Sequence, residues 1–443
     1  MAPPSAPEFL KAPLARPVAV LGDGVSGRGV RALLGRLGSG FTVYDARGRE
    51  FTPAAAAAHS LAVFSPGFAP DHPWLVRVRS AGGIALGELD FASLFWKGRI
   101  VAVTGTNGKT TLVEFLVHAL RHSGLPALAA GNIGTPLSQV AAESDGATGE
   151  IAVCEVSSFQ AETLGHFRAE ALLWTNFAED HLERHGSLEA YFRAKCAAAG
   201  RADRVFAGTS VKGSGPEFCT ILQNSGLDPI YVDTAGQPAD PQLVGTVFEH
   251  YPQRENFILG AAWWRAAGLD GGLLAGAARS FKVGRHRLAK IAEHDGVAYW
   301  NDSKATNFHA VEAALGRFAA PVLLIAGGKS KGGDLAGFVE RIAPKVRHAY
   351  LIGETSAALA SAFAAAGVAH TMSATLAEAV RGATAEAVEG DNILLSPGFA
   401  SFDQFSGYAD RGEQFERQVF ENSAVLRLGS VVGSKRDLRR ETV

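Results

Sequence analysis

A glycine turn between a predicted strand and a predicted helix carries the strongest chemical signal in this sequence. Val101-Ala-Val-Thr-Gly105-Thr-Asn-Gly108-Lys109-Thr-Thr111 is typical of a strand followed by a turn, and Leu112–His122 has a helical pattern. Backbone N–H groups at such a turn attract phosphate oxygens, the lysine adds a point charge, and the hydroxyl after it can ligate Mg²⁺. Only two residues separate Gly105 from Gly108, where the general phosphate-loop pattern has four. The sequence therefore predicts a variant phosphate loop.

Titratable side chains follow two other buried-type runs. Glu155 lies near the end of Ile151–Ser157, and His181 follows the run Leu172–Asn176. The carboxyl ends of parallel strands meet at one edge of a sheet, so we expect both side chains near the phosphate loop, where a carboxylate can hold Mg²⁺. Taken singly, each has a structural alternative: Glu155 as a capping or paired acid, and His181 as a core histidine.

These groups require a parallel sheet to position them, and the whole chain has the pattern of one. Short β-type runs alternate with helical stretches, which is typical of doubly wound α/β folds. The runs are Pro17–Gly22, Phe41–Asp45, Leu61–Ser65, Ile100–Gly105, Ile151–Ser157, Leu172–Asn176, Val322–Gly327, Ala349–Gly353 and Asn392–Ser396.

The length of 443 residues predicts about three domains. We expect a Rossmann-like domain over 1–95, a central phosphate-loop mononucleotide-binding domain over 96–284 and a Rossmann-like domain over 285–443. The last begins with a predicted hairpin, Ala289–His294 and Val297–Asn301, joined through Asp295-Gly296.

Composition excludes several classes of protein. Lys and Arg total 42 against 44 Asp and Glu, so the net charge of -2 gives no broad reason to bind nucleic acid or an anionic membrane. The three cysteines, Cys154, Cys196 and Cys219, have no spacing typical of disulfide frameworks or zinc sites. Residues 1–17 predict a loose lead-in rather than a signal peptide, and no apolar run is long enough to span a bilayer. We expect a cytoplasmic, monomeric enzyme that binds anions locally.

A second glycine turn opens the chain's first domain. Val18-Ala-Val-Leu-Gly22-Asp-Gly24-Val-Ser26-Gly27 ends a strand, and Asp45 follows about 20 residues on, as in dinucleotide-binding folds. From these residues alone, nicotinamide binding is the simplest interpretation.

Six motifs in this order resemble the Mur ligase family, and its glutamate-adding member in particular. The resemblance extends from Val18 to Phe415. The motifs are Gly105-Thr-Asn-Gly-Lys-Thr-Thr111, Gly131-Asn132-Ile-Gly134, Glu155-Val-Ser-Ser-Phe-Gln160, Glu179-Asp-His181-Leu-Glu-Arg-His-Gly186 with Lys195, Asn301-Asp-Ser-Lys-Ala-Thr-Asn307, and Leu395-Ser-Pro-Gly-Phe-Ala-Ser-Phe-Asp-Gln-Phe405. The resemblance implies an ATP- and Mg²⁺-dependent ligase of peptidoglycan biosynthesis. Such an enzyme joins UDP-MurNAc-L-alanine to D-glutamate through an acyl phosphate.

The resemblance also implies roles for individual residues. Lys109, His181 and Lys195 would be catalytic, with Lys195 carbamylated, although from sequence alone Lys195 is most simply an exposed charge on the helix Leu188–Ala199. The metal ligands would be Thr110 (or Thr111), Glu155, His181 and Lys195. ATP would contact Gly105, Thr106, Asn107, Gly108, Lys109, Thr110, Thr111, Asn256, Arg287, Asp302 and Lys304. The UDP-sugar would contact Val25, Ser26, Asp45, Arg47, Gly67, Asn132 and Ser157, and glutamate would contact Thr306, Lys331, Ser401 and Tyr408, with Lys329 as an alternative to Lys331.

Departures from the family pattern cluster around the implied amino-acid pocket. Gly398-Phe399 stands where small residues such as Ala-Cys are common, and Tyr408 replaces a typical phenylalanine. L-glutamate or another amino acid therefore stays open as the substrate. Two other classes are a nucleotide-binding switch, which would not need Lys195, and a nicotinamide oxidoreductase, which would not need Lys109 and its neighbouring hydroxyls.

Overall fold

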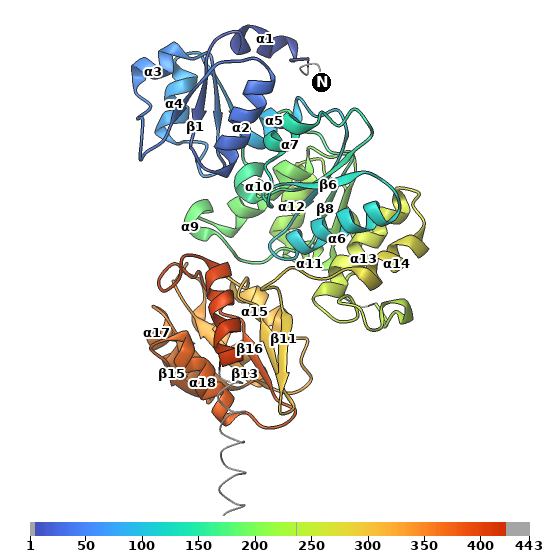
Figure 1. Cartoon of the computed structure of the whole chain (residues 1–443), viewed down its shortest axis with the longest axis vertical. Helices are drawn as coiled ribbons and strands as arrows, with labels where there is room; N and C mark the ends of the chain where they lie inside the picture. The colour runs from blue at the N-terminus through green and yellow to red at the C-terminus, as the bar shows by residue number, and fades with distance from the viewer. Residues whose placement is uncertain (1–4, 236, 422–443) are drawn as a thin grey trace, which may run out of the picture. The chain divides into compact units, whose positions relative to one another are not determined.

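The computed structural model describes residues 5–235 and 237–421, which divide into two compact units (Figure 1). The first unit holds residues up to 178 together with 185–249 and 253–281. The second holds 179–184, 250–252 and 282–421. Three sheets are present, two in the first unit and one in the second. The domain limits at residues 95 and 284 stay predictions.

The first sheet is parallel, with strand order β2-β1-β3-β4. Its strands are β1 (Val18–Leu21), β2 (Phe41–Tyr44), β3 (Leu61–Phe64) and β4 (Ile84–Gly87), and its helices are α2 (Val25–Arg36), α3 (Pro53–Ala58), α4 (Pro73–Ser80) and α5 (Glu88–Ser93). The prediction of a loose lead-in was wrong for part of the N-terminal segment. Residues Glu8–Leu14 form helix α1, because Leu10 and Leu14, four residues apart, bury one face of it in the core.

The second sheet is also parallel, in the order β10-β9-β8-β5-β7-β6. Its strands are β5 (Arg99–Thr104), β6 (Ala127–Gly131), β7 (Ile151–Glu155), β8 (Ala171–Trp174), β9 (Val205–Gly208) and β10 (Ile230–Val232). The helices of this region are α6 (Lys109–His122), α7 (Leu137–Glu143), α8 (Ser158–Ala161), α9 (Leu182–His185), α10 (Leu188–Ala199), α11 (Thr209–Lys212), α12 (Pro216–Asn224), α13 (Gln253–Ala266) and α14 (Gly271–Ser280).

The third sheet has the order β11-β12-β16-β13-β14-β15 and is parallel except for the hairpin β11–β12. Its strands are β11 (Ala289–His294), β12 (Val297–Asn301), β13 (Val322–Gly327), β14 (Val346–Ile352), β15 (Ala369–Met372) and β16 (Asn392–Leu395), and its helices are α15 (Phe308–Leu315), α16 (Leu335–Ile342), α17 (Ser356–Ala365), α18 (Leu376–Glu386) and a last helix that includes residues 408–421. The predicted hairpin is confirmed. Asp295 and Gly296 both have positive φ, 50° and 73°, as a type I′ turn requires.

Both faces of the central strands are buried, which explains the continuous apolar runs of the sequence. In β5, Ile100 and Ala102 pack into one core cluster, whereas Val101 and Val103 pack into another on the opposite face. With both faces covered by helices, polar groups have room only at the strand ends. The predicted α/β class with parallel sheets is confirmed. Within the described ranges, no helix combines the length and hydropathy needed to cross a membrane.

Candidate active site

The phosphate loop lies between β5 and α6, as predicted. Gly108 is the residue before the first turn of α6 and has φ 83°, a left-handed conformation that favours glycine. The loop is fixed from the neighbouring strand β8, since the Asn107 N–H donates to Asn176 Oδ1 (2.9 Å) and Thr175 Oγ1 donates to the Asn107 carbonyl (2.6 Å). Thr106 is buried, and its hydroxyl lies 3.2 Å from the Tyr191 hydroxyl. The loop is thus preformed, which suits a phosphate-binding cradle.

Gly105 cannot carry a side chain without moving its neighbours. Its φ is 138°, and a Cβ added there would overlap the Thr175 hydroxyl. We expect Gly105→Ala to lower the free energy of unfolding by about 1–3 kcal/mol and to abolish nucleotide-dependent activity. The matched control is Gly124→Ala, where φ is 77° but the space is open. Urea unfolding of both variants checks this, and equal losses would show that backbone strain alone accounts for the effect.

Two lysines converge on one carbonyl of this loop. Lys109 Nζ donates to Gly105 O (3.0 Å) and Thr106 O (2.7 Å), and Lys195 Nζ donates to the same Gly105 O (2.7 Å). Lys195 is only 1% exposed and lies 4.6 Å from the ring centroid of Tyr191. The interpretation of Lys195 as an exposed helix charge was therefore wrong. Helix α10 turns this residue inward because its apolar residues Tyr191, Phe192 and Ala198 share the buried side.

The carboxylate predicted to hold metal lies beside the phosphate loop. Glu155, 3% exposed, accepts a hydrogen bond from Thr110 Oγ1 at 2.7 Å and one from Asn132 Nδ2 at 2.8 Å. These three residues follow the carboxyl ends of β5, β7 and β6, three adjacent strands. The structure therefore brings together the hydroxyl, the carboxylate and the amide that the motifs singled out. Thr111 is buried in α6 instead.

Asn256 lies against the same loop. It is 5% exposed, and a Cβ added at Gly108 would lie 2.5 Å from its Oδ1. Helix α13 presents it there, and the side chain donates to Gln253 Oε1 at 3.1 Å. A residue predicted to contact adenine thus sits at the start of α6, although 147 positions of sequence separate Lys109 and Asn256.

The residues predicted to contact UDP gather at the carboxyl ends of β1 and β2. Val25 and Ser26 open helix α2, and Val25 is 54% exposed. Asp45 accepts from the backbone N–H of Asp23 (3.2 Å) and of Arg47 (3.0 Å), and these two bonds lower its pKa. An ionised, half-buried carboxylate beside a glycine turn can accept hydrogen bonds from a nucleoside. Gly67 follows β3, so it lies at the same carboxyl edge of this sheet.

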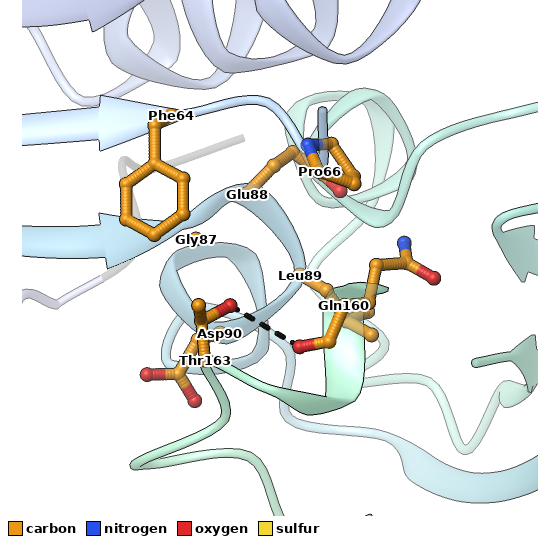
Figure 2. Close-up of a pocket in the computed structure, with 8 residues that line it drawn as sticks. All are labelled: Phe64, Pro66, Gly87, Glu88, Leu89, Asp90, Gln160 and Thr163. Atoms are coloured by element: carbon orange, nitrogen blue, oxygen red, sulfur yellow. Dashed lines mark hydrogen bonds between the residues drawn. The ribbon is translucent and has the colours of Figure 1, made fainter. Parts of the chain in front are cut away.

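Figure 2 shows a small pocket where the first and second sheets meet within the first unit. It is lined by Phe64, Pro66, Gly87, Glu88, Leu89, Asp90, Gln160 and Thr163. Ser157, a predicted substrate contact, lies beside it as the N-cap of α8, with its hydroxyl bonded to Gln160.

Two carboxylates of this pocket, Asp90 and Glu88, connect helix α5 to segments that belong to the second sheet's region. Neither was predicted from the sequence to have a role. Asp90 Oδ1 accepts the backbone N–H groups of Gly165, His166 and Phe167 at 2.7–2.9 Å. Glu88 accepts the Ser138 N–H at 2.8 Å, and burial raises the pKa of Glu88. The only sequence feature that marks them is an acidic pair directly after a glycine, Gly87-Glu-Leu-Asp90. This feature is a weak signal of a functional or structural joint, because surface helices often begin with acidic residues.

In the second unit, Lys331 lies near the segment that carries His181. Lys331 Nζ is 3.7 Å from Asp180 Oδ1, and Asn307 Nδ2 donates to Asp180 Oδ2 at 2.9 Å. Lys329, the alternative to Lys331, is exposed. The geometry thus places Lys331 rather than Lys329 beside an acidic partner. Asp180 was part of a quoted motif but carried no predicted role.

His181 has an uncommon backbone conformation, with φ 56°, and burial lowers the pKa of its imidazole despite the nearby Asp180. A neutral imidazole is the form that ligates metal. The predicted metal ligands come from both units. Thr110, Glu155 and Lys195 belong to the first unit, whereas His181 belongs to the second. Across residues 5–235 and 237–421, no group of three or more His, Cys, Asp and Glu side chains is placed to hold a metal ion.

Of the remaining predicted residues, Asp302, Lys304 and Thr306 follow β12, Ser401 follows β16, Tyr408 lies in the last helix, and Arg287 precedes β11. Asp302 is 8% exposed and accepts from the Leu288 N–H and from Ser396 Oγ, both at 2.9 Å. Lys304 Nζ lies 3.8 Å from the ring centroid of Tyr408. Arg287 and Thr306 are half-buried, and Ser401 is 2% exposed. Apart from Arg287 and Tyr408, these predicted nucleotide and amino-acid contacts thus come from segments that follow two adjacent strands.

Asp302 makes stability depend on pH. Burial raises its pKa from 3.8 to about 7, against the lowering effect of its hydrogen bonds and of Arg287 and Arg411. Between about pH 4 and pH 7 the folded state then binds more protons than the unfolded state, so stability falls as pH rises. We expect Asp302→Asn to remove up to about 4 kcal/mol of that fall. Urea unfolding at pH 5 and pH 7.5 checks this, with the exposed Asp410→Asn as control; an unchanged slope for Asp302→Asn would contradict it.

Comparisons with known proteins agree with this geometry. Family models for the Mur ligase middle domain and for the Mur ligase glutamate ligase domain match residues 103–200 and 286–399. The UDP-N-acetylmuramoylalanine--D-glutamate ligase of Desulfotalea psychrophila is 38% identical over 400 residues, which cover 85% of each chain. The enzyme of the same name from Solibacter usitatus is 36% identical over 410 residues, covering 87% of this chain and 88% of that one.

Solved structures share the fold. UDP-N-acetylmuramate-alanine ligase from Thermotoga maritima matches with a TM-score of 0.56 at 16% identity, covering 92% of this chain and 99% of that one. The MurF ligase of Thermotoga maritima, solved in complex with ADP, matches with a TM-score of 0.56 at 16% identity, covering 82% and 95%. Sequence identity to the curated relatives over most of the length decides the assignment, and this chain belongs to the Mur ligase family.

Proposed function

We propose that this chain is the ATP-dependent ligase that adds D-glutamate to UDP-N-acetylmuramoyl-L-alanine in peptidoglycan synthesis. The observation that carries the proposal is the junction of Lys109, Thr110 and Glu155 at one phosphate loop, in a chain whose relatives are named for this reaction. Lys109 supplies a charge for the transferred phosphoryl group, and the loop N–H groups bind the phosphate oxygens. We assign the base to Asn256, which lies beside Gly108.

The oxygen donors beside the loop fit Mg²⁺. A hard divalent cation prefers carboxylate and hydroxyl oxygens, and Thr110 Oγ1 and Glu155 Oε2 are already in contact at 2.7 Å. Bound there with the nucleotide, Mg²⁺ would neutralise charge on the phosphates. His181, with its lowered pKa, adds a neutral imidazole to the proposed set.

Carbamylation of Lys195 suits its surroundings. The neutral amine would add to carbon dioxide and lose a proton, which turns a cation into an anion. Buried beside Gly105, the Lys195 and Lys109 ammonium groups would otherwise lie within about 6 Å of each other and repel. An anionic Lys195 would instead attract Lys109 and could share a metal ion with Glu155.

The reaction needs two displacements. An oxygen of the alanine carboxylate attacks the γ-phosphorus, and ADP leaves as the acyl phosphate forms. The amine of glutamate then attacks the acyl carbon, loses a proton, and phosphate leaves. We assign the muramoyl side to Asn132 and Ser157, and the uridine diphosphate to Val25, Ser26, Asp45, Arg47 and Gly67. We assign the nucleotide also to Arg287, Asp302 and Lys304, and the carboxylates of glutamate to Thr306, Lys331, Ser401 and Tyr408.

Location and assembly follow from the same proposal. We place the enzyme in the cytoplasm, because all three cysteines are free, as in a reducing compartment. We also propose that the enzyme is a monomer.

The test is phosphate release from ATP with Mg²⁺ and UDP-N-acetylmuramoyl-L-alanine, measured against a panel of D- and L-amino acids. We expect phosphate release that requires D-glutamate. Release with L-glutamate instead would overturn the amino-acid assignment and keep the ligase. No amino-acid-dependent release would overturn the ligase itself.

A further inference from the structure

A fully buried arginine lies beneath the segments assigned to the amino acid. Arg411 belongs to the last helix of the second unit and is 0% exposed. The family resemblance implies a role for the nearby Tyr408 but none for Arg411. Burial is strong enough to lower the pKa of its guanidinium to about 10, although Asp403 and Asp302 oppose that shift.

The guanidinium binds two segments at once. Its Nε donates to Ser303 Oγ (3.0 Å) and its Nη2 to Ser303 O (2.9 Å), while Nη1 and Nη2 both donate to Phe399 O (3.2 Å each). Ser303 lies between Asp302 and Lys304, and Phe399 lies two residues before Ser401. Ser303 Oγ in turn donates to the carbonyl of Tyr408 at 2.8 Å. One planar group therefore fixes the relative positions of three segments.

The loop that carries Lys331 is tied to the same place. Gly328 is so close to Arg411 that an added Cβ would lie 3.3 Å from Nη1, and the next residue, Lys329, donates its N–H to Ala400 O at 2.8 Å. The four residues assigned to glutamate are close in sequence to these contacts. Thr306 is three residues from Ser303, Lys331 is two from Lys329, and Ser401 is two from Phe399. Tyr408 accepts a hydrogen bond from Ser303 directly.

Burying a charged arginine in this way costs free energy of folding. The four hydrogen bonds of the guanidinium named above go to uncharged oxygens, so the charges of Asp403 and Asp302 offset the desolvation of the guanidinium only in part. A planar fork with five donors can nevertheless hold carbonyls from two segments in fixed directions, which a lysine cannot. Its charge also lies in contact with a loop assigned to a ligand that carries two carboxylates.

We propose that Arg411 is a positioning residue for the amino-acid substrate. It sets the spacing between the 301–306 segment and the 396–401 loop, so that the donors assigned to glutamate face both of its carboxylates. The inference rests on the proposed function, since it needs an amino-acid site in the second unit.

The nucleotide contacts should depend less on Arg411. Asp302 and Lys304 have further anchors of their own, because the Asp302 N–H donates to Leu395 O (2.8 Å) and the Lys304 N–H to His286 O (3.0 Å). Loss of the guanidinium should therefore weaken glutamate binding selectively, which a general loss of stability would not do.

The experiment compares Arg411→Lys with wild type in steady-state kinetics and thermal unfolding. We expect the KM for glutamate to rise about tenfold or more, while the KM values for ATP and for the UDP-sugar change less than about threefold. Ser303→Ala keeps the guanidinium and removes one acceptor, so it should give a smaller rise in the same KM. Arg341→Lys is the matched control, because Arg341 forms an exposed pair with Glu312 in the same unit.

Each possible result of these experiments supports or overturns a stated proposal. A lower unfolding temperature with unchanged KM values would reduce Arg411 to a stabilising residue and overturn the proposal, as would equal rises in all three KM values. If Arg411→Lys does not fold, Ser303→Ala decides alone: an unchanged glutamate KM overturns the proposal. Wild-type enzyme without glutamate-dependent turnover would instead overturn the proposed function.

Discussion

Replacing Lys195 by alanine is expected to lower kcat by at least about 1,000-fold, with partial recovery when short carboxylic acids are added. The proposed carbamate supplies an anion beside the phosphate loop, and a formate or acetate ion can occupy the space that the side chain leaves. Because Lys195 is 1% exposed and bonded to Gly105 O, a purely structural loss would not respond to added anions. Phosphate release with and without acetate measures the effect.

Arg193→Ala on the same helix is the control for Lys195. Arg193 forms an exposed pair with Glu189, so its loss should leave kcat within about twofold. Near-normal activity of Lys195→Ala would remove Lys195 from the mechanism. A dead variant that carboxylic acids do not rescue would leave it essential but argue against the carbamate.

The second large effect concerns the lysine of the phosphate loop. We expect Lys109→Met to lower kcat by about 1,000-fold or more, because no other side chain on the loop supplies a mobile positive charge to the transferred phosphoryl group. Methionine keeps most of the apolar stem, so α6 should stay folded. Kinetics of phosphate release, with circular dichroism as a check on folding, measure the outcome.

Lys97→Met is the comparison for Lys109. Lys97 lies in the same unit, its side chain is 56% exposed, and it forms an ion pair with Asp145. We expect that variant to turn over normally. If Lys109→Met and Lys97→Met lost similar amounts of activity, the loss would reflect net charge rather than the loop.

Most strands that the structure describes were predicted, but β4, β6, β9, β10 and β15 were not. β13 (Val322–Gly327) has the bounds expected for it because β-branched and large apolar residues cluster there. The hairpin strands β11 and β12 also have the expected bounds, and their signal was the Asp295-Gly296 turn between them. β6 (Ala127–Gly131) was missed, since its Ala-Leu-Ala-Ala-Gly sequence has low β propensity. β10 and β15 were missed because they are edge strands with mostly exposed residues. Packing against a neighbouring strand, rather than local sequence, makes these segments extended.

The residues of the site also fall into a group that the sequence predicted and a group that it did not. Motifs at strand ends predicted Lys109, Thr110 and Glu155, because parallel topology brings strand ends together. The burial of Lys195 and of Arg411 depends on which face of a helix packs inward, and the joints made by Asp90 and Glu88 depend on backbone groups more than 45 residues away. Such long-range contacts leave no local pattern in a sequence.

The account's central claim is that ATP activates a carboxylate as an acyl phosphate before glutamate attacks it. The direct measurement uses UDP-N-acetylmuramoyl-L-alanine with a heavy oxygen isotope in the alanine carboxylate, followed by mass spectrometry of the released phosphate and of the peptide product. The account predicts one labelled oxygen in phosphate for each amide bond formed, because the carboxylate oxygen that attacks phosphorus leaves with it. Unlabelled phosphate accompanying normal product formation would contradict it.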